Sequence, residues 1–279
     1  MGAGCDPYAR RGVSQVSIQI DRRGDGLLDT VGNLQGMFDI VYGLQQYGEF
    51  ISPETRHLDL YLAQMTLLDK SCQAYALGGV RTRDCIEMNC IAMGVTREEL
   101  ARDPAVVAVV NTNSPMQLDI PMTEAVVELA ASGQACCITP FTLAGSMSPA
   151  TLAGTLAQQT AEVLAVMTLA QSVRPGAKLI YGSFASNVDM LSGAPALGTP
   201  EYTKAAFASG QIARRLGMPL RSSNTTSSNC VDAQAAYESE MSLWGSIMGG
   251  ANLICHAAGW LENGIASLSR TLPRPSRPG

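Results

Sequence analysis

The sequence predicts an α/β fold, a TIM (β/α)8 barrel, and two observations carry that prediction. Short apolar runs rich in strand-forming residues alternate with helical patterns along the chain. The loops that follow the runs are long and rich in Ser, Thr, Asn and Gly, whereas the turns before them are short. Because a TIM barrel carries its active site on the loops that follow its strands, this asymmetry favours a barrel. An open doubly wound sheet obeys a similar rule and stays open as the alternative.

Seven apolar runs are predicted as strands of a sheet that is covered on both faces. They are apolar throughout, which is typical of parallel strands buried between two layers. In chain order they span residues 37–43, 72–77, 106–111, 135–139, 178–183, 219–223 and 252–257. Since seven strands are one short of a closed barrel, the eighth must come from the first 35 residues or be absent. Residues 16–27 indicate a small hairpin, not an inner strand.

Three hydroxyl-proline pairs predict where helices begin, because a Ser or Thr caps a helix whose first position suits proline. The pairs are Ser52-Pro53, Ser148-Pro149 and Thr199-Pro200. In the helix after Pro149, an apolar stripe is expected to pack against the sheet. The members of that stripe are Leu152, Leu156, Val163, Met167 and Ala170.

The predicted organisation is one barrel with a segment at each end. Residues 1–35 form an N-terminal segment with the hairpin, residues 36–269 form the barrel, and residues 270–279 form a disordered tail. The tail is rich in Pro and Arg and cannot continue a helix.

Composition excludes several classes of partner. The 19 Lys and Arg residues are scattered among 24 Asp and Glu residues, so no basic stripe for nucleic acid is expected. No apolar stretch approaches the length of a membrane span, and the N-terminus lacks an apolar leader. The eight cysteines are therefore interpreted as reduced thiols, and the protein is placed in the cytoplasm.

The residues at the ends of the predicted strands suggest the kind of ligand. Tyr181 and Phe184 offer aromatic faces, which attract quaternary ammonium groups, and Arg221 offers a two-pronged grip on a carboxylate. Asp189 and His256 complete the set. A small zwitterion that carries both charges would fit. The alternative, in which the aromatic rings complete the upper core layer, stays open.

Neither a Schiff-base lysine nor a bound metal is expected. None of the three lysines, Lys70, Lys178 and Lys204, follows a strand. The spacings of the cysteines and of His57 do not assemble the three ligands that a catalytic zinc needs, so the cysteines are interpreted as buried thiols.

Segments over most of the chain resemble the trimethylamine methyltransferase family. The motifs SPATLAG, PGAKLIYGS, DMLSGAP, DAQAAYE and GANLICHAAG occur in the family's order, and the resemblance covers roughly residues 20–269. It implies a TIM barrel that moves a methyl group from a methylated amine to the cobalt(I) of a separate corrinoid protein. Members with pyrrolysine act on trimethylamine, and others act on quaternary amines such as glycine betaine. Since this sequence has no pyrrolysine, the resemblance favours a quaternary amine.

The resemblance, together with the strand-end positions, gives each candidate residue a role. His256 is the catalytic candidate. Substrate binding is assigned to Tyr181, Phe184, Asp189 and Arg221, and the residues expected to face the corrinoid are Ser146, Ser183 and Asn224. The corrinoid is expected on the partner protein. Family chains extend beyond both ends of this one, so the sequence is expected to be truncated, with an incomplete barrel.

Several alternatives remain open. His256 could be a structural histidine bonded to a backbone carbonyl, and Arg221 could belong to a surface ion pair. The chain as a whole could be a non-catalytic homologue, or another TIM-barrel enzyme that uses a metal or a pterin. A homo-oligomer is also compatible with the sequence.

Overall fold

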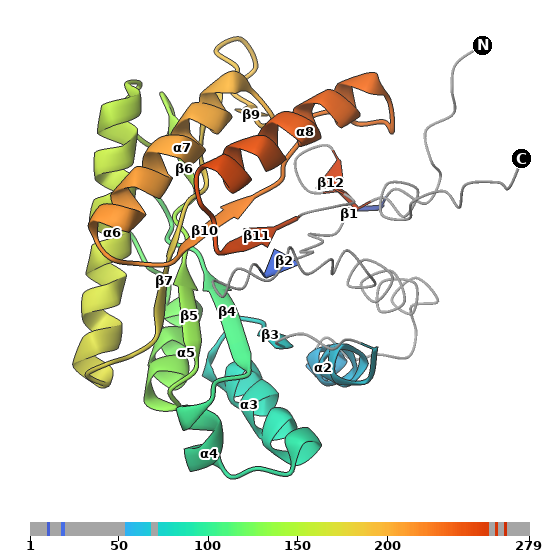
Figure 1. Cartoon of the computed structure of the whole chain (residues 1–279), viewed down its shortest axis with the longest axis vertical. Helices are drawn as coiled ribbons and strands as arrows, with labels where there is room; N and C mark the ends of the chain where they lie inside the picture. The colour runs from blue at the N-terminus through green and yellow to red at the C-terminus, as the bar shows by residue number, and fades with distance from the viewer. Residues whose placement is uncertain are drawn as a thin grey trace, which may run out of the picture.

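The computed structural model describes residues 10–11, 18–19, 54–67, 72–256, 260–261 and 265–266. Its centre is a curled parallel sheet of six strands, which forms a half-barrel (Figure 1). The six strands are β3 (Cys72–Ala74), β4 (Val106–Val110), β5 (Ala135–Ile138), β7 (Leu179–Gly182), β10 (Leu220–Ser223) and β11 (Leu253–Cys255). The helices are α2 (Arg56–Leu67), α3 (Gly79–Met93), α4 (Arg97–Arg102), α5 (Ile120–Ala131), α6 (Leu152–Val173), α7 (Pro200–Arg215) and α8 (Ala233–Met248).

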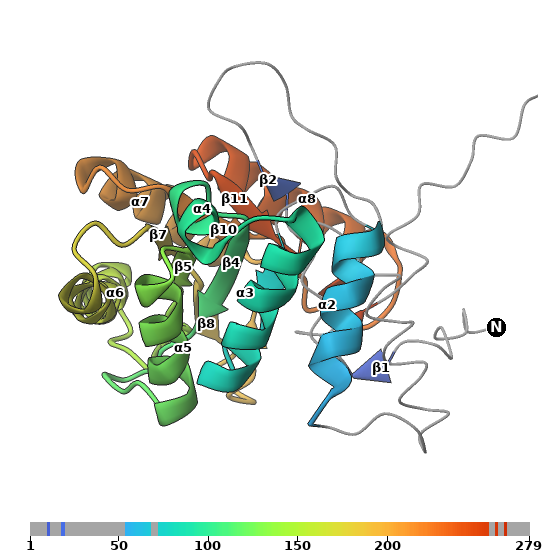
Figure 2. The same ribbon diagram turned by 90° about the horizontal axis from the view of Figure 1, so that it is seen from below.

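The order of the strands decides between the two predicted architectures. From β3 to β11, each parallel strand pairs with the next one along the chain, with no reversal of direction across the sheet. A doubly wound sheet reverses its order at a switch point, whereas a barrel does not. Apart from the short α4, which contacts α3, successive helices also contact one another in chain order along the outside of the sheet (Figure 2). The predicted barrel architecture is therefore confirmed as an incomplete TIM barrel.

The six later strand predictions are confirmed to within three residues at each end. The first, residues 37–43, lies outside the described residues, as do the boundaries at 35 and 270. Of the predicted hairpin, only β2 (Ile18–Gln19) is described, and it pairs antiparallel with β11 as an extra strand of the main sheet. Three further short strands, β1 (Arg10–Arg11), β12 (Trp260–Leu261) and β13 (Ile265–Ala266), form a separate antiparallel sheet.

One cap prediction is confirmed and one is wrong. Thr199 caps α7 by accepting a hydrogen bond from the backbone N–H of Tyr202. Helix α6, however, is capped by Thr151 rather than Ser148, whose hydroxyl bonds to that of Thr155 instead. Because the helix begins three residues later than predicted, Leu152 lies in its first turn and is 42% exposed, outside the buried stripe. The start predicted at Ser52-Pro53 lies among residues that are not described.

The two faces of the sheet bury different sets of side chains, because successive residues of a strand point to opposite sides. The outer face packs against the helices and includes Val106, Ala108, Val110, Cys136, Ile138, Tyr181, Leu220 and Ile254. The inner face forms a second cluster with Val107, Val109, Cys137, Ile180, Leu253 and Cys255. The apolar character of both faces was predicted, and the position of a residue in its strand decides which face it joins.

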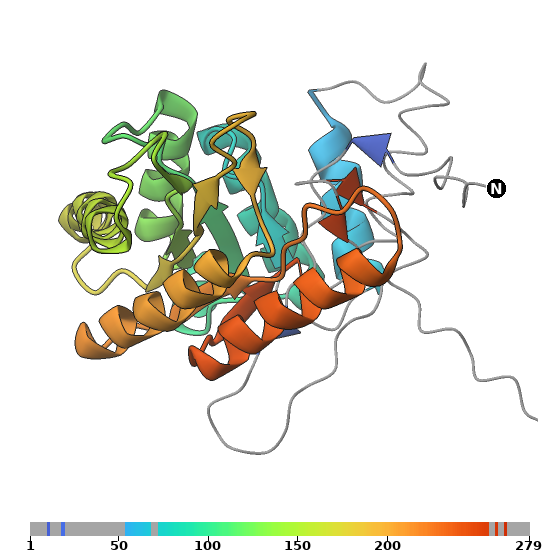
Figure 3. The same cartoon turned by 90° about the horizontal axis from the view of Figure 1, so that it is seen from above.

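The two longest loops after the strands form a small sheet of their own. Strand β6 (Thr142–Ala144) follows β5, and β8 (Ala185–Val188) and β9 (Pro195–Ala196) follow β7. Strand β6 pairs parallel with β8, which pairs antiparallel with β9. Figure 3 shows these strands at one end of the main sheet, beside the parallel pair of helices α7 and α8. The loops predicted to carry function are therefore ordered structures at the carboxyl end of the barrel.

Candidate functional site

Three of the predicted site residues meet at the carboxyl ends of β7, β10 and β11. The guanidinium carbon of Arg221 lies 5.5 Å from the centre of the Phe184 ring. The His256 ring stands edge-on to the same ring, at 6.1 Å between centroids and 81° between planes. Phe184 also contacts Tyr202 and Phe141, so it is the centre of a compact aromatic cluster. We name the set of Phe184, Arg221 and His256 the strand-end cluster.

The Arg221 guanidinium carries a buried positive charge. The residue is only 2% exposed and lies on the inner face, against the thiols of Cys137 and Cys255. Its Nη1 donates to the backbone carbonyl of Ser183 over a long 3.5 Å, and its Nε has no hydrogen-bond partner among the described residues. No carboxylate of the described residues forms an ion pair with it. Since a buried charge is costly unless it is paired, this arrangement favours an anion from outside.

Three groups near Arg221, the side chains of Cys137, His256 and Tyr202, are neutral at ordinary pH. Burial raises the pKa of the Cys137 thiol to about 12, although the Arg221 charge opposes the rise. Burial, followed by the charge of Arg221, holds the pKa of His256 well below its usual range. Burial likewise raises the pKa of Tyr202, whose hydroxyl donates to the backbone carbonyl of Ser223 at 2.9 Å. The cluster therefore holds one positive charge, with an uncharged imidazole beside it.

His256 occupies an unusual backbone conformation. Its φ is +56°, in the left-handed region that residues with a side chain rarely adopt. It directly follows β11 and is buried, so the turn out of the strand aims its ring at Phe184. Such conformations cost on the order of 1 kcal/mol and gather at functional sites. The left-handed backbone therefore makes residue 256 a candidate functional position, whatever its side chain does.

Tyr181, Ser183 and Asn224 are not brought to the strand-end cluster. The Tyr181 hydroxyl bonds to Gln159 and Thr160 of α6, at 3.1 and 2.9 Å. The Ser183 hydroxyl bonds to Ser209 of α7, and the Asn224 amide bonds to Ser239 of α8. All three side chains therefore face the helices. Neighbouring residues on the same strands, such as Ile180, face inward instead.

Asp189 and Ser146 lie in exposed parts of the loops. The Asp189 carboxylate accepts hydrogen bonds from the backbone N–H of Leu191 and the hydroxyl of Ser192, at 2.8 and 2.9 Å. These bonds lower the pKa of Asp189, and they fix the turn between β8 and β9. Ser146 lies in the turn that follows β6. Asp189 is thus held by its own loop, and Ser146 is open to solvent.

Three buried hydroxyls near these strand ends, those of Ser223, Thr225 and Thr142, were missed from the sequence. Ser223 follows Arg221 by two residues in β10, so its side chain lies on the same face of the strand. Its Oγ, like the hydroxyl oxygens of Thr142 and Thr225, is buried without a hydrogen-bond partner in the described part of the chain. The two-residue spacing from Arg221 was the available signal for Ser223. No comparable signal pointed to Thr142.

Within the described ranges, no three His, Cys, Asp or Glu residues are grouped so that they could hold a metal ion. None of the described helices is long and apolar enough to cross a membrane. All seven cysteines of the described part are free thiols.

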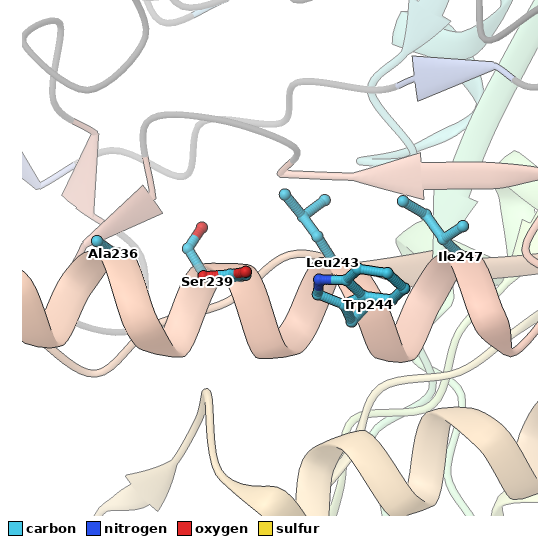
Figure 4. A pocket seen from close by; sticks show the side chains of 6 residues that line it. Ala236, Ser239, Leu243, Trp244 and Ile247 are labelled. Carbon is cyan, nitrogen blue, oxygen red and sulfur yellow. The ribbon is translucent and has the colours of Figure 1, made fainter.

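A separate hollow of about 530 Å³ lies along α8 (Figure 4). It is lined by Ala236, Ser239, Glu240, Leu243, Trp244 and Ile247. No predicted site residue lines it, and its walls are almost entirely apolar. It is therefore distinct from the strand-end cluster.

The fold and the site together define an incomplete (β/α) barrel with a cationic, aromatic site at the carboxyl ends of its strands. A family model described as Trimethylamine methyltransferase (MTTB) matches residues 49–270. The chain belongs to the trimethylamine methyltransferase family, as its motifs indicated.

Curated relatives support the same assignment. Over 208 residues the chain is 40% identical to a glycine betaine methyltransferase of Desulfitobacterium hafniense (strain Y51). The matched residues make up 74% of this chain and 43% of the relative. Over 173 residues it is 32% identical to the trimethylamine methyltransferase MttB1 of Methanosarcina mazei, covering 62% of this chain and 35% of the relative. The chain therefore spans less than half the length of these relatives.

Proposed function

We propose that the chain is part of a methyltransferase that moves a methyl group from a quaternary amine, such as glycine betaine, to the cobalt(I) of a corrinoid protein. The observation that carries the proposal is the buried charge of Arg221 beside Phe184, which forms no ion pair with a carboxylate in the described part of the chain. The names of the relatives, which include both a glycine betaine and a trimethylamine methyltransferase, support the methylated-amine class.

The strand-end cluster suits a ligand that carries a carboxylate and an ammonium group. Arg221 would bind the carboxylate through charge-assisted hydrogen bonds, for which its Nε is available in the described structure. Such bonds contribute roughly 1.5 to 3 kcal/mol each when the donor is charged. The aromatic side chains around Phe184 would contact the methylated ammonium, which prefers aromatic surroundings to aliphatic ones. Glycine betaine carries both groups a short distance apart.

The charge states of the cluster agree with the chemistry of demethylation. When the carbon–nitrogen bond of a quaternary amine breaks, its electron pair stays on nitrogen and the leaving group is a neutral tertiary amine. No proton has to be supplied. A neutral His256 is therefore compatible with the reaction, and its role is to orient the substrate and exclude water rather than to act as an acid.

The corrinoid would supply a strongly nucleophilic cobalt that accepts the methyl group. On this chain, Ser146 is the one predicted corrinoid-facing residue whose side chain is exposed at the carboxyl end. Ser183 and Asn224 are committed to hydrogen bonds with helices α7 and α8, so we do not assign them to that face. We also infer a cytoplasmic location, since cobalt(I) persists only under strongly reducing conditions. A homo-oligomer remains a prediction.

The direct test is to incubate the purified chain with glycine betaine and cob(I)alamin and to follow methylated cobalamin by its absorbance. We expect transfer with glycine betaine, and a rate at least about 10-fold lower for the Arg221→Met variant. Arg215→Met, at an exposed arginine of α7, is the matched charge-removal control and should retain the rate.

Two outcomes would contradict the proposal in different ways. Binding of glycine betaine without transfer under any condition would indicate a non-catalytic homologue. The chain could instead act on another substrate. If a chelator abolishes that activity, or if the activity depends on an added pterin, the chain is a different kind of barrel enzyme.

A further inference from the structure

Helix α6 carries a buried carboxylate, Glu162, that holds the loop after β4. The residue is 3% exposed, and its Oε2 accepts hydrogen bonds from the hydroxyls of Thr112 and Ser114, the latter at 2.7 Å. Its Oε1 accepts from the backbone N–H of Met116 at 3.0 Å. One side chain thus fixes three residues of a single loop.

Gln158, one turn earlier on α6, extends this arrangement to a second loop. Its Nε2 donates to Glu162 Oε1 at 3.0 Å and to the backbone carbonyl of Met147 at 2.8 Å. Met147 lies in the turn after β6, next to Ser146. Gln158 and Glu162, which we name the α6 clamp, therefore join the loops that follow β4 and β6 at the carboxyl end of the barrel.

The charge on Glu162 strengthens the hydrogen bonds by which the α6 clamp holds its two loops. Burial disfavours a charge on Glu162, but the hydrogen bonds from Thr112, Met116, Ser114 and Gln158 outweigh it and lower the pKa of the carboxyl group. Glu162 therefore stays ionised at neutral pH and binds its donors strongly. The loops nevertheless present side chains to solvent, since Met116 is 63% exposed and Ser146 is exposed as well.

We propose that Gln158 and Glu162 are positioning residues, which hold these two loops in the arrangement that the corrinoid protein contacts. The inference rests on the proposed function. A methyl acceptor carried by another protein must approach the strand-end cluster from the carboxyl end of the barrel. The clamped loops border that end, so their fixed geometry sets how the acceptor protein docks.

The test compares two methyl acceptors, free cob(I)alamin and a purified corrinoid-binding protein loaded with cob(I)alamin. Free cob(I)alamin needs no docking surface. We expect Glu162→Ala to raise both the KM and the Kd for the corrinoid-binding protein about 10-fold, while the rate with free cob(I)alamin changes less than about 2-fold. Thr168→Ala, an exposed hydroxyl on the same helix, is the matched control and should change neither value.

The conservative variant Glu162→Gln removes the charge of the side chain but keeps its shape and most of its hydrogen bonds. In Glu162→Gln, the remaining oxygen can still accept from Met116 and Gln158, and the hydroxyls of Thr112 and Ser114 can rotate to accept from the new amide. We therefore expect this variant to recover most of the affinity for the corrinoid-binding protein. Hydrogen exchange should be faster in residues 112–117 and 145–148 of Glu162→Ala, but not of Glu162→Gln.

The results distinguish this inference from the proposed function. If the unmodified chain transfers methyl groups and Glu162→Ala releases both loops without weakening the corrinoid-binding protein, the positioning role is wrong and the function stands. If the unmodified chain binds the corrinoid-binding protein through the clamped loops but transfers nothing, the function is wrong and the docking role stands. An unmodified chain that binds no such protein contradicts the inference.

Discussion

The guanidinium of Arg221 lies over the ring of Phe184, 5.5 Å from its centre, at the end of the barrel where the strands finish. A cation–π contact of this kind stabilises a desolvated cation by roughly 2 kcal/mol, less than the cost of burying it. The part of the desolvation free energy that this contact does not offset lowers the stability of the folded protein. Binding of a carboxylate to Arg221 would offset that part as well. Under the proposed function, this relationship would link the stability of the chain to the binding of a carboxylate ligand.

Replacing Arg221 with Met should leave the protein at least as stable as before. Removing a buried charge in favour of an apolar side chain of similar length is often neutral or stabilising by about 1 to 4 kcal/mol. Arg221→Ala is the matched variant, and it should lower the free energy of unfolding by about 2 kcal/mol or more because it leaves a cavity. Urea denaturation of both variants checks the pair. A strongly destabilised Arg221→Met would mean that the charge is paired inside the protein.

Stability should fall with decreasing pH because of His256. Its folded-state pKa is depressed by burial and by Arg221, so the unfolded chain binds the proton first as the pH drops. The contribution is complete above the unfolded value of about 6.5 and is lost below it, at up to about 1.4 kcal/mol per pH unit. Asn tolerates the left-handed backbone. In His256→Asn, the dependence of the free energy of unfolding on pH that comes from His256 should therefore disappear. An unchanged slope in that variant, measured by urea denaturation between about pH 7.5 and about pH 5.5, would show that His256 does not titrate this way.

Phe184→Leu should destabilise the fold by roughly 1 to 3 kcal/mol, because the ring contacts Arg221, His256, Tyr202 and Phe141. Phe207→Leu, on the exposed side of α7, is the matched control and should cost under about 0.5 kcal/mol. Thermal and urea unfolding measure both. Equal effects at the two positions would argue against a tightly packed strand-end cluster.

Gly210→Ala should loosen the contact between α7 and α8. A Cβ at Gly210 would lie 2.0 Å from the backbone oxygen of Gly249, so the two helices could not keep their present distance. Overpacking of this kind costs about 1 to 3 kcal/mol. Gln211→Ala, an exposed neighbour on α7, should leave the free energy of unfolding nearly unchanged. A fully stable Gly210→Ala would contradict the close approach of the helices.

Much of the fold was predictable because strand and helix patterns are local. The six confirmed strands and the Thr199 cap each depend on a few neighbouring residues. The start of α6 was misplaced because a proline after a Ser resembles a helix start, while the chain makes one more turn before Thr151 caps the helix.

The site was predicted less completely, and the reason is physical. Strands that are apolar on both faces show no alternation, so the sequence does not indicate which residues face the inside of the barrel. Arg221 and Phe184 were brought together, whereas Tyr181 faces the helices. The α6 clamp could not be predicted, since Glu162 lies about fifty residues from the loop that it holds.

Whether Arg221 binds the carboxylate of the ligand is tested most directly by the affinities of the unmodified chain for glycine betaine and for choline, measured by titration calorimetry. The two ligands share a trimethylammonium group, but only glycine betaine carries a carboxylate for Arg221. We expect glycine betaine to bind at least about 10-fold more tightly than choline, and we expect Arg221→Met to remove the difference. Equal affinities for the two ligands in the unmodified chain would contradict this expectation.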